Sequence, residues 1–508
     1  MKQPATAFAI GALSALAFQP LGWWPLMPLA LAALCELVDR APTLRRALLI
    51  GWLFGLGQFV VGLNWIATAF TYQAAMPAWL GWIAVVLLSL YLAVFPMLAA
   101  GLAWRIGKDR PLALILALSG SWALTEWLRA GLFTGFAWNP VSVTMVDTPL
   151  RGLAAGIGTY GLSAVVVIIG GVVWLALKRD FKPAFAGAAA IALATLIFWT
   201  QKPAQTAGLK PIRIVQPNIG QQDKWRPGFD EIAARRLDLL SIQAPPVSRL
   251  LFWPEAAITN PLTDQRAEAR WRTDTERLRA TRTLATDDLL LTGGLGLTSS
   301  DGRRLAGATN SVFVMAPLGK IIGRYDKAHL VPYGEYLPMR PLLSAIGLSR
   351  LAPGNLDFKP GPGPRTITLP DATKVGFQLC YEIIFSGEVV DRRNRPDFIF
   401  NPSNDAWFGA WGPPQHLAQT RLRAAEEGLP VIRSTPTGIS ALIDAQGALM
   451  GTIPLGQAGV IDGVLPPPAA SPTLFAQAGN TIPVVLSFLL LFAGIAVVRS
   501  RRYSAANI

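Results

Sequence analysis

The most informative stretch of the sequence is VGFQLCYE, residues 375–382. Its first half has the composition of a short buried strand, and Cys380 follows where that strand is expected to end. A cysteine at a strand end can be presented at a cleft, where its thiolate acts as a nucleophile. Because a free thiol has a pKa of about 8.5, this role requires a partner. Taken alone, the stretch fits an inert buried cysteine at least as well.

Two earlier stretches contain residues that suit such a partner. LFWPE, residues 251–255, places Glu255 directly after an apolar strand, where a partly desolvated carboxylate can act as a general base. RYDKAHL, residues 324–330, places Lys327 in a polar turn after another apolar run. Each is equally compatible with a surface charge. His329, in the second stretch, is an alternative partner for Cys380 in a Cys-His dyad.

The surrounding segment, residues 201–475, alternates short β-like runs with polar helical stretches. We expect amphipathic helices over 229–240 and 415–428. Strands separated by helices predict a layered α/β domain. The expected strands are Ile212–Gln216, Leu250–Trp253, Leu289–Gly293, Ser311–Met315, Val375–Leu379 and Phe398–Asn401.

The rest of the chain is strongly apolar. Of the 508 residues, 52% are hydrophobic and 15% are charged, against about 25% charged in soluble domains. We therefore predict an N-terminal transmembrane bundle over 1–200, a catalytic domain over 201–475, and a C-terminal transmembrane helix with a short tail over 476–508. Apolar runs long enough to cross about 30 Å of hydrocarbon predict about eight spans. They are 5–22, 24–38, 47–70, 78–104, 111–129, 152–177, 183–200 and 479–498.

Basic residues occur in alternate loops between these runs. The positive-inside rule places such loops and the C-terminal tail in the cytoplasm, so residues 201–475 are expected on the opposite side. The net charge of +14 then reflects membrane orientation, and we expect no nucleic-acid partner. The basic clusters are Arg40, Arg45 and Arg46; Arg105, Lys108 and Arg110; Lys178, Arg179 and Lys182; and Arg499, Arg501 and Arg502.

Taken together and in this order, the Glu255, Lys327 and Cys380 motifs resemble the nitrilase, or carbon–nitrogen hydrolase, superfamily. The resemblance implies an αββα sandwich in which Glu255 is the general base, Lys327 stabilises the oxyanion and Cys380 is the nucleophile. It also implies supporting residues: Glu335, Glu382, and Tyr381, whose backbone N–H is a candidate second oxyanion donor.

A nitrilase-like domain between membrane segments resembles the apolipoprotein N-acyltransferase family. GLNW (62–65), EWLR (126–129) and NDAWFG (404–409) extend the resemblance along the chain. It implies that Cys380 takes a fatty acyl chain from a membrane phospholipid as a thioester. The acceptor would be the α-amine of a diacylglyceryl-cysteine at the N-terminus of a lipoprotein. The implied location is the bacterial inner membrane, with the catalytic domain periplasmic. Neither a metal nor an organic cofactor is expected.

Apolar residues near the predicted site suggest contacts with lipid or a lid over the site. They are Trp225, Leu343, Ile346, Trp407, Phe408 and Trp411. The last three lie in a loop with Gly and Pro, where core packing is the default alternative to contact with lipid. Two alternatives remain at this stage. One is a membrane-tethered amidase that hydrolyses small C–N bonds, and the other is a transporter or receptor with an inactive nitrilase-like domain.

Overall fold

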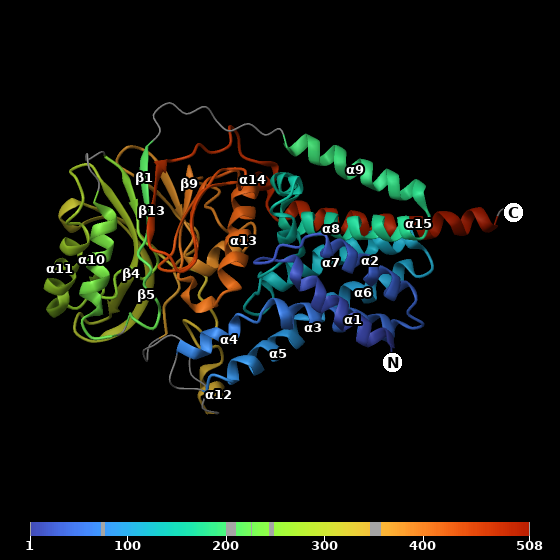
Figure 1. The fold of residues 1–508 in the computed structure, drawn as a ribbon, viewed down its shortest axis with the longest axis horizontal. Helices are drawn as coiled ribbons and strands as arrows, with labels where there is room; N and C mark the ends of the chain where they lie inside the picture. Colours follow the sequence, from blue (N-terminus) through green and yellow to red (C-terminus); the bar gives the residue numbers. More distant parts are fainter. Residues whose placement is uncertain are drawn as a thin grey trace.

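The computed structural model describes residues 2–72, 77–199, 210–224, 226–242, 248–345 and 357–506. A bundle of apolar helices forms one end of the molecule and a two-sheet sandwich flanked by helices forms the other (Figure 1). The predicted combination of a helical membrane bundle and an α/β sandwich is therefore confirmed. Trp225 and Ile346 lie outside the described residues.

The bundle contains nine helices within the described part of the chain that carry the predicted apolar runs. They are α1 (Lys2–Ser14), α2 (Leu26–Asp39), α3 (Leu44–Gly62), α5 (Leu80–Leu92), α6 (Val94–Gly107), α7 (Pro111–Gly131), α8 (Ala154–Leu177), α9 (Phe181–Trp199) and α15 (Thr481–Ala506). Among the described residues, 6 helical stretches are long and apolar enough to cross a membrane, counting α5 with α6 as one. The helices α1 and α2 have only 13 and 14 residues, so the count of about eight spans stays a prediction.

Small residues bring the bundle helices close together. A Cβ atom on Gly57 of α3 would lie 2.2 Å from the carbonyl oxygen of Phe8 in α1, and one on Gly11 would meet the backbone of Phe54. Such close backbone approach is the usual packing mode where lipid removes the hydrophobic drive between helices. Larger side chains at these glycines would push α1 away from α3.

The sandwich has two sheets with parallel strands at the centre and antiparallel strands at the edges. The first sheet has the order β13-β1-β2-β4-β5-β6, with β3 beside β4, and the second has the order β12-β11-β10-β9-β8-β7. The strands of the first sheet are β1 (Pro211–Gln216), β2 (Leu250–Phe252), β3 (Thr263–Asp264), β4 (Leu289–Ser299), β5 (Leu305–Ala316), β6 (Lys320–Asp326) and β13 (Gly459–Val464). Those of the second are β7 (Thr366–Thr368), β8 (Lys374–Phe377), β9 (Phe398–Pro402), β10 (Val431–Ser434), β11 (Ser440–Ile443) and β12 (Leu449–Ile453).

Alternation along each strand explains the layers. In β2, Leu250 and Phe252 face the second sheet, and the Phe252 ring lies 5.0 Å from that of Phe400. Leu251 faces outward and packs with Leu237 of α10 (Phe229–Ser241). Helices α10 and α11 (Arg270–Ala280) cover the first sheet, and α13 (Gly412–Glu427) covers the second (Figure 1). The αββα order and all six expected strands are confirmed, although β4 and β5 pair over a longer hairpin than predicted.

Helix α13 also joins the sandwich to the bundle. It packs against α8 and is buried on all sides, so its polar residues need partners. Gln415 accepts hydrogen bonds from the Trp138 indole (2.8 Å) and the Asn139 amide (3.0 Å). Arg421 donates to Asp147 at 2.6 Å. These bonds place one end of the sandwich directly against the membrane helices.

Candidate active site

Cys380 lies just beyond the end of β8, where the backbone turns sharply. It begins the short 3₁₀ turn Cys380–Ile384 and has φ +53, a left-handed value that non-glycine residues rarely adopt. Its side chain is only 5% exposed. The ring of His416 donates from Nε2 to the Cys380 carbonyl oxygen at 3.2 Å. The backbone at Cys380 is therefore held in a rare conformation by its surroundings, as is common at functional sites.

Glu255 follows β2 in the neighbouring sheet. Parallel strands β1, β2 and β4 end on the same edge, and the buried Glu255 carboxylate lies at that edge. Its Oε1 accepts a hydrogen bond from the Asn310 amide at 2.7 Å and lies 3.9 Å from Lys327 Nζ. The second oxygen, Oε2, is buried and has no hydrogen-bond partner among the described residues. One side of the carboxylate is therefore anchored, and the other is available for a proton.

Lys327 follows β6 and is almost completely buried. Its Nζ donates to Glu335 at 3.0 Å, and the Asn310 amide also donates to Glu335, at 2.8 Å. Burial lowers the pKa of Lys327, but Glu335 and Glu255 outweigh this effect and raise it above its usual value. The lysine is thus a permanent cation, and Asn310 ties both carboxylates to it.

Glu382 connects the cysteine turn with the lysine segment. Its carboxylate accepts hydrogen bonds from the backbone N–H groups of Ala328 (2.7 Å), His329 (3.0 Å) and Leu379 (2.7 Å), and from the Tyr325 hydroxyl (2.8 Å). Burial raises the pKa of Glu382, and these bonds oppose that rise. Glu382 therefore holds the backbone on both sides of the site in register and has a positioning role.

The charged residues of the site act on the pKa of the Cys380 thiol. Burial and the negative charge of Glu255 raise the pKa of Cys380 well above its usual value, whereas Lys327 and a hydrogen bond from the Asn404 backbone lower it. A thiol in this setting stays protonated at rest. For this thiol to act as a nucleophile, a base has to take its proton as the sulfur attacks, and the free oxygen of Glu255 suits that role. This arrangement can perform acyl transfer through a thioester.

Sequence reasoning missed two groups that hold the site. Asn310 is in the middle of β5, and its two amide hydrogens bridge Glu255 and Glu335. Behind Cys380, His416 Nδ1 lies 2.9 Å from Asp405, whose other oxygen accepts from Arg433 at 2.7 Å. Burial raises the pKa of Asp405, but Arg433 and His416 lower it below the usual range. The run of buried polar residues Thr309–Ser311 inside an apolar strand was the available signal for Asn310.

Several residues that the sequence predicted for the site have partners in the structure other than Cys380 or lipid. Of the three loop aromatics, Phe408 follows the core-packing alternative. It is 9% exposed and its ring lies 4.7 Å from the Trp65 ring and 5.5 Å from the Trp138 ring, at the junction with the bundle. Trp407 and Trp411 are half-buried.

Tyr381 is buried, and its hydroxyl reaches the Gly135 carbonyl of the bundle at 3.4 Å. The His329 ring stacks on Phe385, with centroids 3.8 Å apart. Leu343 is half-buried on the short helix α12 (Arg340–Ala345). Glu255, Lys327 and Glu335 are therefore the predicted charged residues that the structure brings together around Cys380.

The sandwich and its cluster of charges define a membrane-embedded member of the carbon–nitrogen hydrolase superfamily. The model of that domain, described as carbon-nitrogen hydrolase, matches residues 212–472. A second model, the apolipoprotein N-acyltransferase N-terminal domain, matches residues 10–172.

Close full-length relatives agree with both matches. The chain is 34% identical over 519 residues to an apolipoprotein N-acyltransferase of Rhodopseudomonas palustris, with 96% of this chain and 94% of that protein covered. It is 35% identical over 492 residues to one of Rhizobium rhizogenes, with 91% and 90% covered. The chain belongs to the apolipoprotein N-acyltransferase family.

Proposed function

We propose that this membrane-bound acyltransferase carries a fatty acyl group on Cys380, from a phospholipid to the α-amine of a diacylated lipoprotein. The observation that carries the proposal is the buried network in which Asn310 and Lys327 link Glu255 to Glu335 beside the thiol. The fold and the full-length relatives support the same reaction class.

In the first half-reaction, Glu255 takes the thiol proton as the Cys380 sulfur attacks an ester carbonyl of the phospholipid. Lys327 and the Tyr381 backbone N–H stabilise the oxyanion. The carbon–oxygen ester bond then breaks, and the departing glycerol oxygen takes the proton from Glu255. A lysophospholipid leaves, and the acyl group remains as a thioester on Cys380.

In the second half-reaction, the free amine of the lipoprotein attacks the thioester. Glu255 takes a proton from the nitrogen, the carbon–sulfur bond breaks, and the thiolate recovers a proton from Glu255. The products are an amide and the original enzyme. Because one site handles both substrates in turn, ping-pong kinetics follow. The buried setting of Cys380 also protects the thioester from water.

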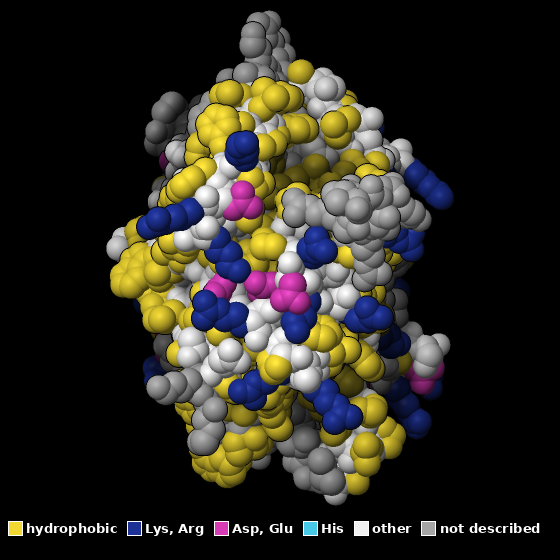
Figure 2. Space-filling model, turned by 90° about the vertical axis from the view of Figure 1, so that its right-hand side faces the viewer, with side chains coloured by type: hydrophobic (Ala, Val, Ile, Leu, Met, Phe, Trp, Pro, Cys, Tyr) yellow, Lys and Arg dark blue, Asp and Glu magenta, His cyan; other side chains and the backbone are white. Residues whose placement is uncertain are grey.

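The same proposal places the catalytic domain on the periplasmic side of the inner membrane. Lys and Arg gather on the end of the bundle farthest from the sandwich (Figure 2). Lys178 of this region lies 3.0 Å from Asp39 and 3.3 Å from Glu36. A basic end is expected in the cytoplasm. Alkaline phosphatase fused after residue 205 should be active, and fusion after Arg179 inactive. The reverse pattern would overturn the orientation.

We also propose that apolar residues around α12 guide lipid to the site. Met339 and Leu342 are exposed, and Leu343 is half-buried, on a segment that lies between Lys327 and Cys380 in the sequence. Long acyl chains avoid water at about 0.8 kcal/mol per CH₂, so they need an apolar route. The proposed lipid contacts also include Trp407 and Trp411, which are half-buried. Trp225 and Ile346 are included on the sequence alone, since they lie outside the described residues.

The function is tested with purified full-length protein and labelled phospholipid. Intact-mass measurement should show one added acyl group on the wild type and none on Cys380→Ser. Addition of a diacylated lipopeptide should remove the group and yield a triacylated peptide. An enzyme that hydrolyses small amides but never holds a lipid acyl group would instead support the amidase alternative.

A further inference from the structure

A second buried lysine lies next to the catalytic cluster. Lys224 lies between β1 and α10, and its side chain is only 6% exposed. Its Nζ atom is buried and has no hydrogen-bond partner among the described residues. A buried ammonium without a partner is costly, so such a lysine requires an explanation.

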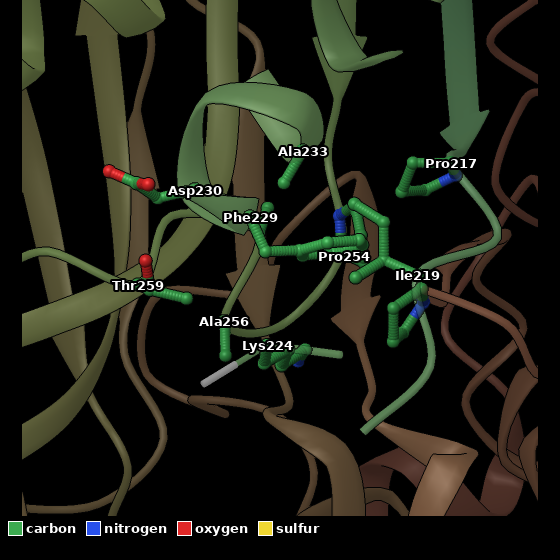
Figure 3. A pocket seen from close by; sticks show the side chains of 11 residues that line it. Pro217, Ile219, Lys224, Phe229, Asp230, Ala233, Pro254, Ala256 and Thr259 are labelled. Carbon is green, nitrogen blue, oxygen red and sulfur yellow. The ribbon is translucent and has the colours of Figure 1, made fainter. Parts of the chain in front are cut away.

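The residues that line the cavity beside Lys224 indicate which group its ammonium interacts with. The cavity is lined by residues on both sides of Glu255, namely Pro254 and Ala256, and by Phe229 of α10. Figure 3 shows Lys224 beside Ala256, with Phe229 and Pro254 on the opposite side of the space. The free volume is about 10 Å³, enough for at most one water. The cavity is therefore too small for a substrate or a phosphate group.

Glu255 also lacks one contact, because one of its carboxylate oxygens has no hydrogen-bond partner among the described residues. Lys327 makes its short contacts, at 3.0 Å, with Glu335 and lies 3.9 Å from Glu255. Two carboxylates thus share one cation at short range, and Oε2 of Glu255 is buried without a hydrogen bond. Burial lowers the pKa of Lys224 to about 8, opposed by the charges of Glu255 and Cys380. The lysine therefore interacts electrostatically with the groups that exchange the proton.

We propose that Lys224 is a positioning residue of the active site, a second cation that stabilises the single negative charge shared by Glu255 and Cys380. The proposal rests on the proposed function only in taking Glu255 as the base and Cys380 as the nucleophile. Lys327 makes its short contact with Glu335, and Lys224 supplies a second positive charge that interacts with Glu255. No atom of Lys224 needs to touch the substrate.

The contribution of Lys224 depends on pH in a defined direction. The groups that face it are Glu255 and Cys380, with Asp230 in the cavity wall and Lys327 beyond Glu255. Its pKa in the folded protein is lowered, so it is charged below about 8 and neutral above. The support it gives to the Glu255–Cys380 pair is therefore present at neutral pH and lost as the pH rises through about 8.

The test measures the reactivity of Cys380 without any lipid. Iodoacetamide alkylates Cys380 in the full-length protein carrying Cys35→Ala, from about pH 6 to about pH 9.5. Lys224→Met should react about tenfold more slowly than the control Lys320→Met near neutral pH, which corresponds to a shift of about one pKa unit. The ratio of the two rates should approach one above the pKa of Lys224. Lys320 is exposed at the start of β6, so its removal controls for the loss of a charge.

Two further measurements separate this role from a structural one. In a Glu255→Gln background, the slowing caused by Lys224→Met should differ from that in the parent protein, because Lys224 then acts on the Cys380 thiolate alone. Lys224→Gln provides a second variant, and the melting temperature of each is recorded. Equal rates at every pH, or a slowing of both variants that is independent of pH and follows a lower melting temperature, would overturn the proposal. If wild type forms no thioester but shows the Lys224 effect, the proposed function fails and this inference stands.

Discussion

The two cysteines of this chain are both free and both buried, at 0% and 5% exposure, yet their surroundings are opposite. Cys35 lies inside α2 with regular helical backbone, in a cluster of apolar side chains that come mainly from the bundle. Cys380 lies in a left-handed turn that faces Glu255 and Lys327. Burial is therefore no guide to reactivity, whereas backbone geometry and nearby charge are.

Charged residues near a cysteine in sequence are not sufficient either. Glu36 follows Cys35 directly, but its carboxylate accepts from the Trp174 indole at 2.7 Å and lies 3.3 Å from Lys178 at the end of the bundle. In the sandwich, Glu255 keeps one oxygen without a hydrogen bond in the described part of the chain. The carboxylate proposed as the base therefore comes from a segment distant in sequence from its cysteine.

The largest expected effect tests this contrast directly. Cys380→Ala should abolish both thioester formation and acyl transfer, because only a thiol at this position can carry the acyl group as a thioester. Cys35→Ala should keep most activity, since it removes only a small apolar group. Intact mass after phospholipid exposure and transfer to a lipopeptide provide the measurements. Inactive Cys35→Ala with active Cys380→Ala would reverse the assignment.

Removing the charges around Cys380 should have the next largest effect. Glu255→Gln and Lys327→Ala should each slow formation of the thioester by about 10²–10³-fold, the usual cost of losing one stabilising group for the oxyanion or the proton transfer. Single-turnover labelling with phospholipid measures this step alone. Near-normal labelling in either variant would show that the Cys380 surroundings are structural, as those of Cys35 are.

The sequence predicted Glu255, Lys327 and Cys380 because three short motifs, each ambiguous alone, together and in this order resemble the nitrilase superfamily. The role of Asn310 was not predicted from the sequence in this way. It lies within β5 opposite Leu295, and only the pairing of β4 with β5 and the position of Glu335 turn its amide toward two carboxylates. The polar run Thr309–Ser311 marks the position in the sequence, but the partners of Asn310 depend on sheet register and on two separate loops, which no single stretch contains.

Contacts across the junction were equally hidden. The sequence left two possibilities for Phe408, an exposed loop that contacts lipid or packing in a core, and could not name its partners. Its partners Trp65 and Trp138 come from the bundle, more than 250 residues earlier in the chain. His416 reaches Cys380 from α13, 36 residues along the chain. Aromatic burial between domains follows from tertiary packing, which local composition does not encode.

Phe408 connects the two regions, so its loss should weaken the whole molecule. Phe408→Ala should lower the free energy of unfolding by about 3–5 kcal/mol, the usual cost of removing a buried aromatic ring. We expect a clearly lower melting temperature in detergent and a moderate loss of activity. Trp411→Ala, a half-buried neighbour, is the matched control and should cost less. An unchanged melting temperature for Phe408→Ala would show that the ring does not stabilise the junction, and would favour a role in contact with lipid.

A smaller effect is expected at Leu343. Leu343→Glu should leave the melting temperature near that of the wild type because the side chain is only half-buried on α12. Placing a carboxylate against acyl chains at a cost of about 1.4 kcal/mol would reduce phospholipid use about tenfold. Alkylation of Cys380 by iodoacetamide should be unchanged. Equal loss of both reactions would indicate damage to the fold, and loss of neither would place the lipid route elsewhere.

The smallest expected effect is at His329, the other candidate partner for Cys380. Its ring is stacked on Phe385 and hydrogen-bonded to the Thr134 backbone, so it is directed toward the junction. Burial lowers the pKa of His329, and the ring is therefore neutral at neutral pH. His329→Ala loses a stacking contact worth about 0.5–1.5 kcal/mol of stability.

The backbone N–H of His329 still reaches Glu382 in that variant, so the positioning of Lys327 is retained. The rate of thioester formation should consequently stay within about threefold of the wild type, a barrier change below about 0.7 kcal/mol. Single-turnover labelling of His329→Ala beside Lys327→Ala makes the comparison under one set of conditions. A loss at His329 as large as that at Lys327, with an unchanged melting temperature, would establish the Cys-His dyad and remove Glu255 as the base.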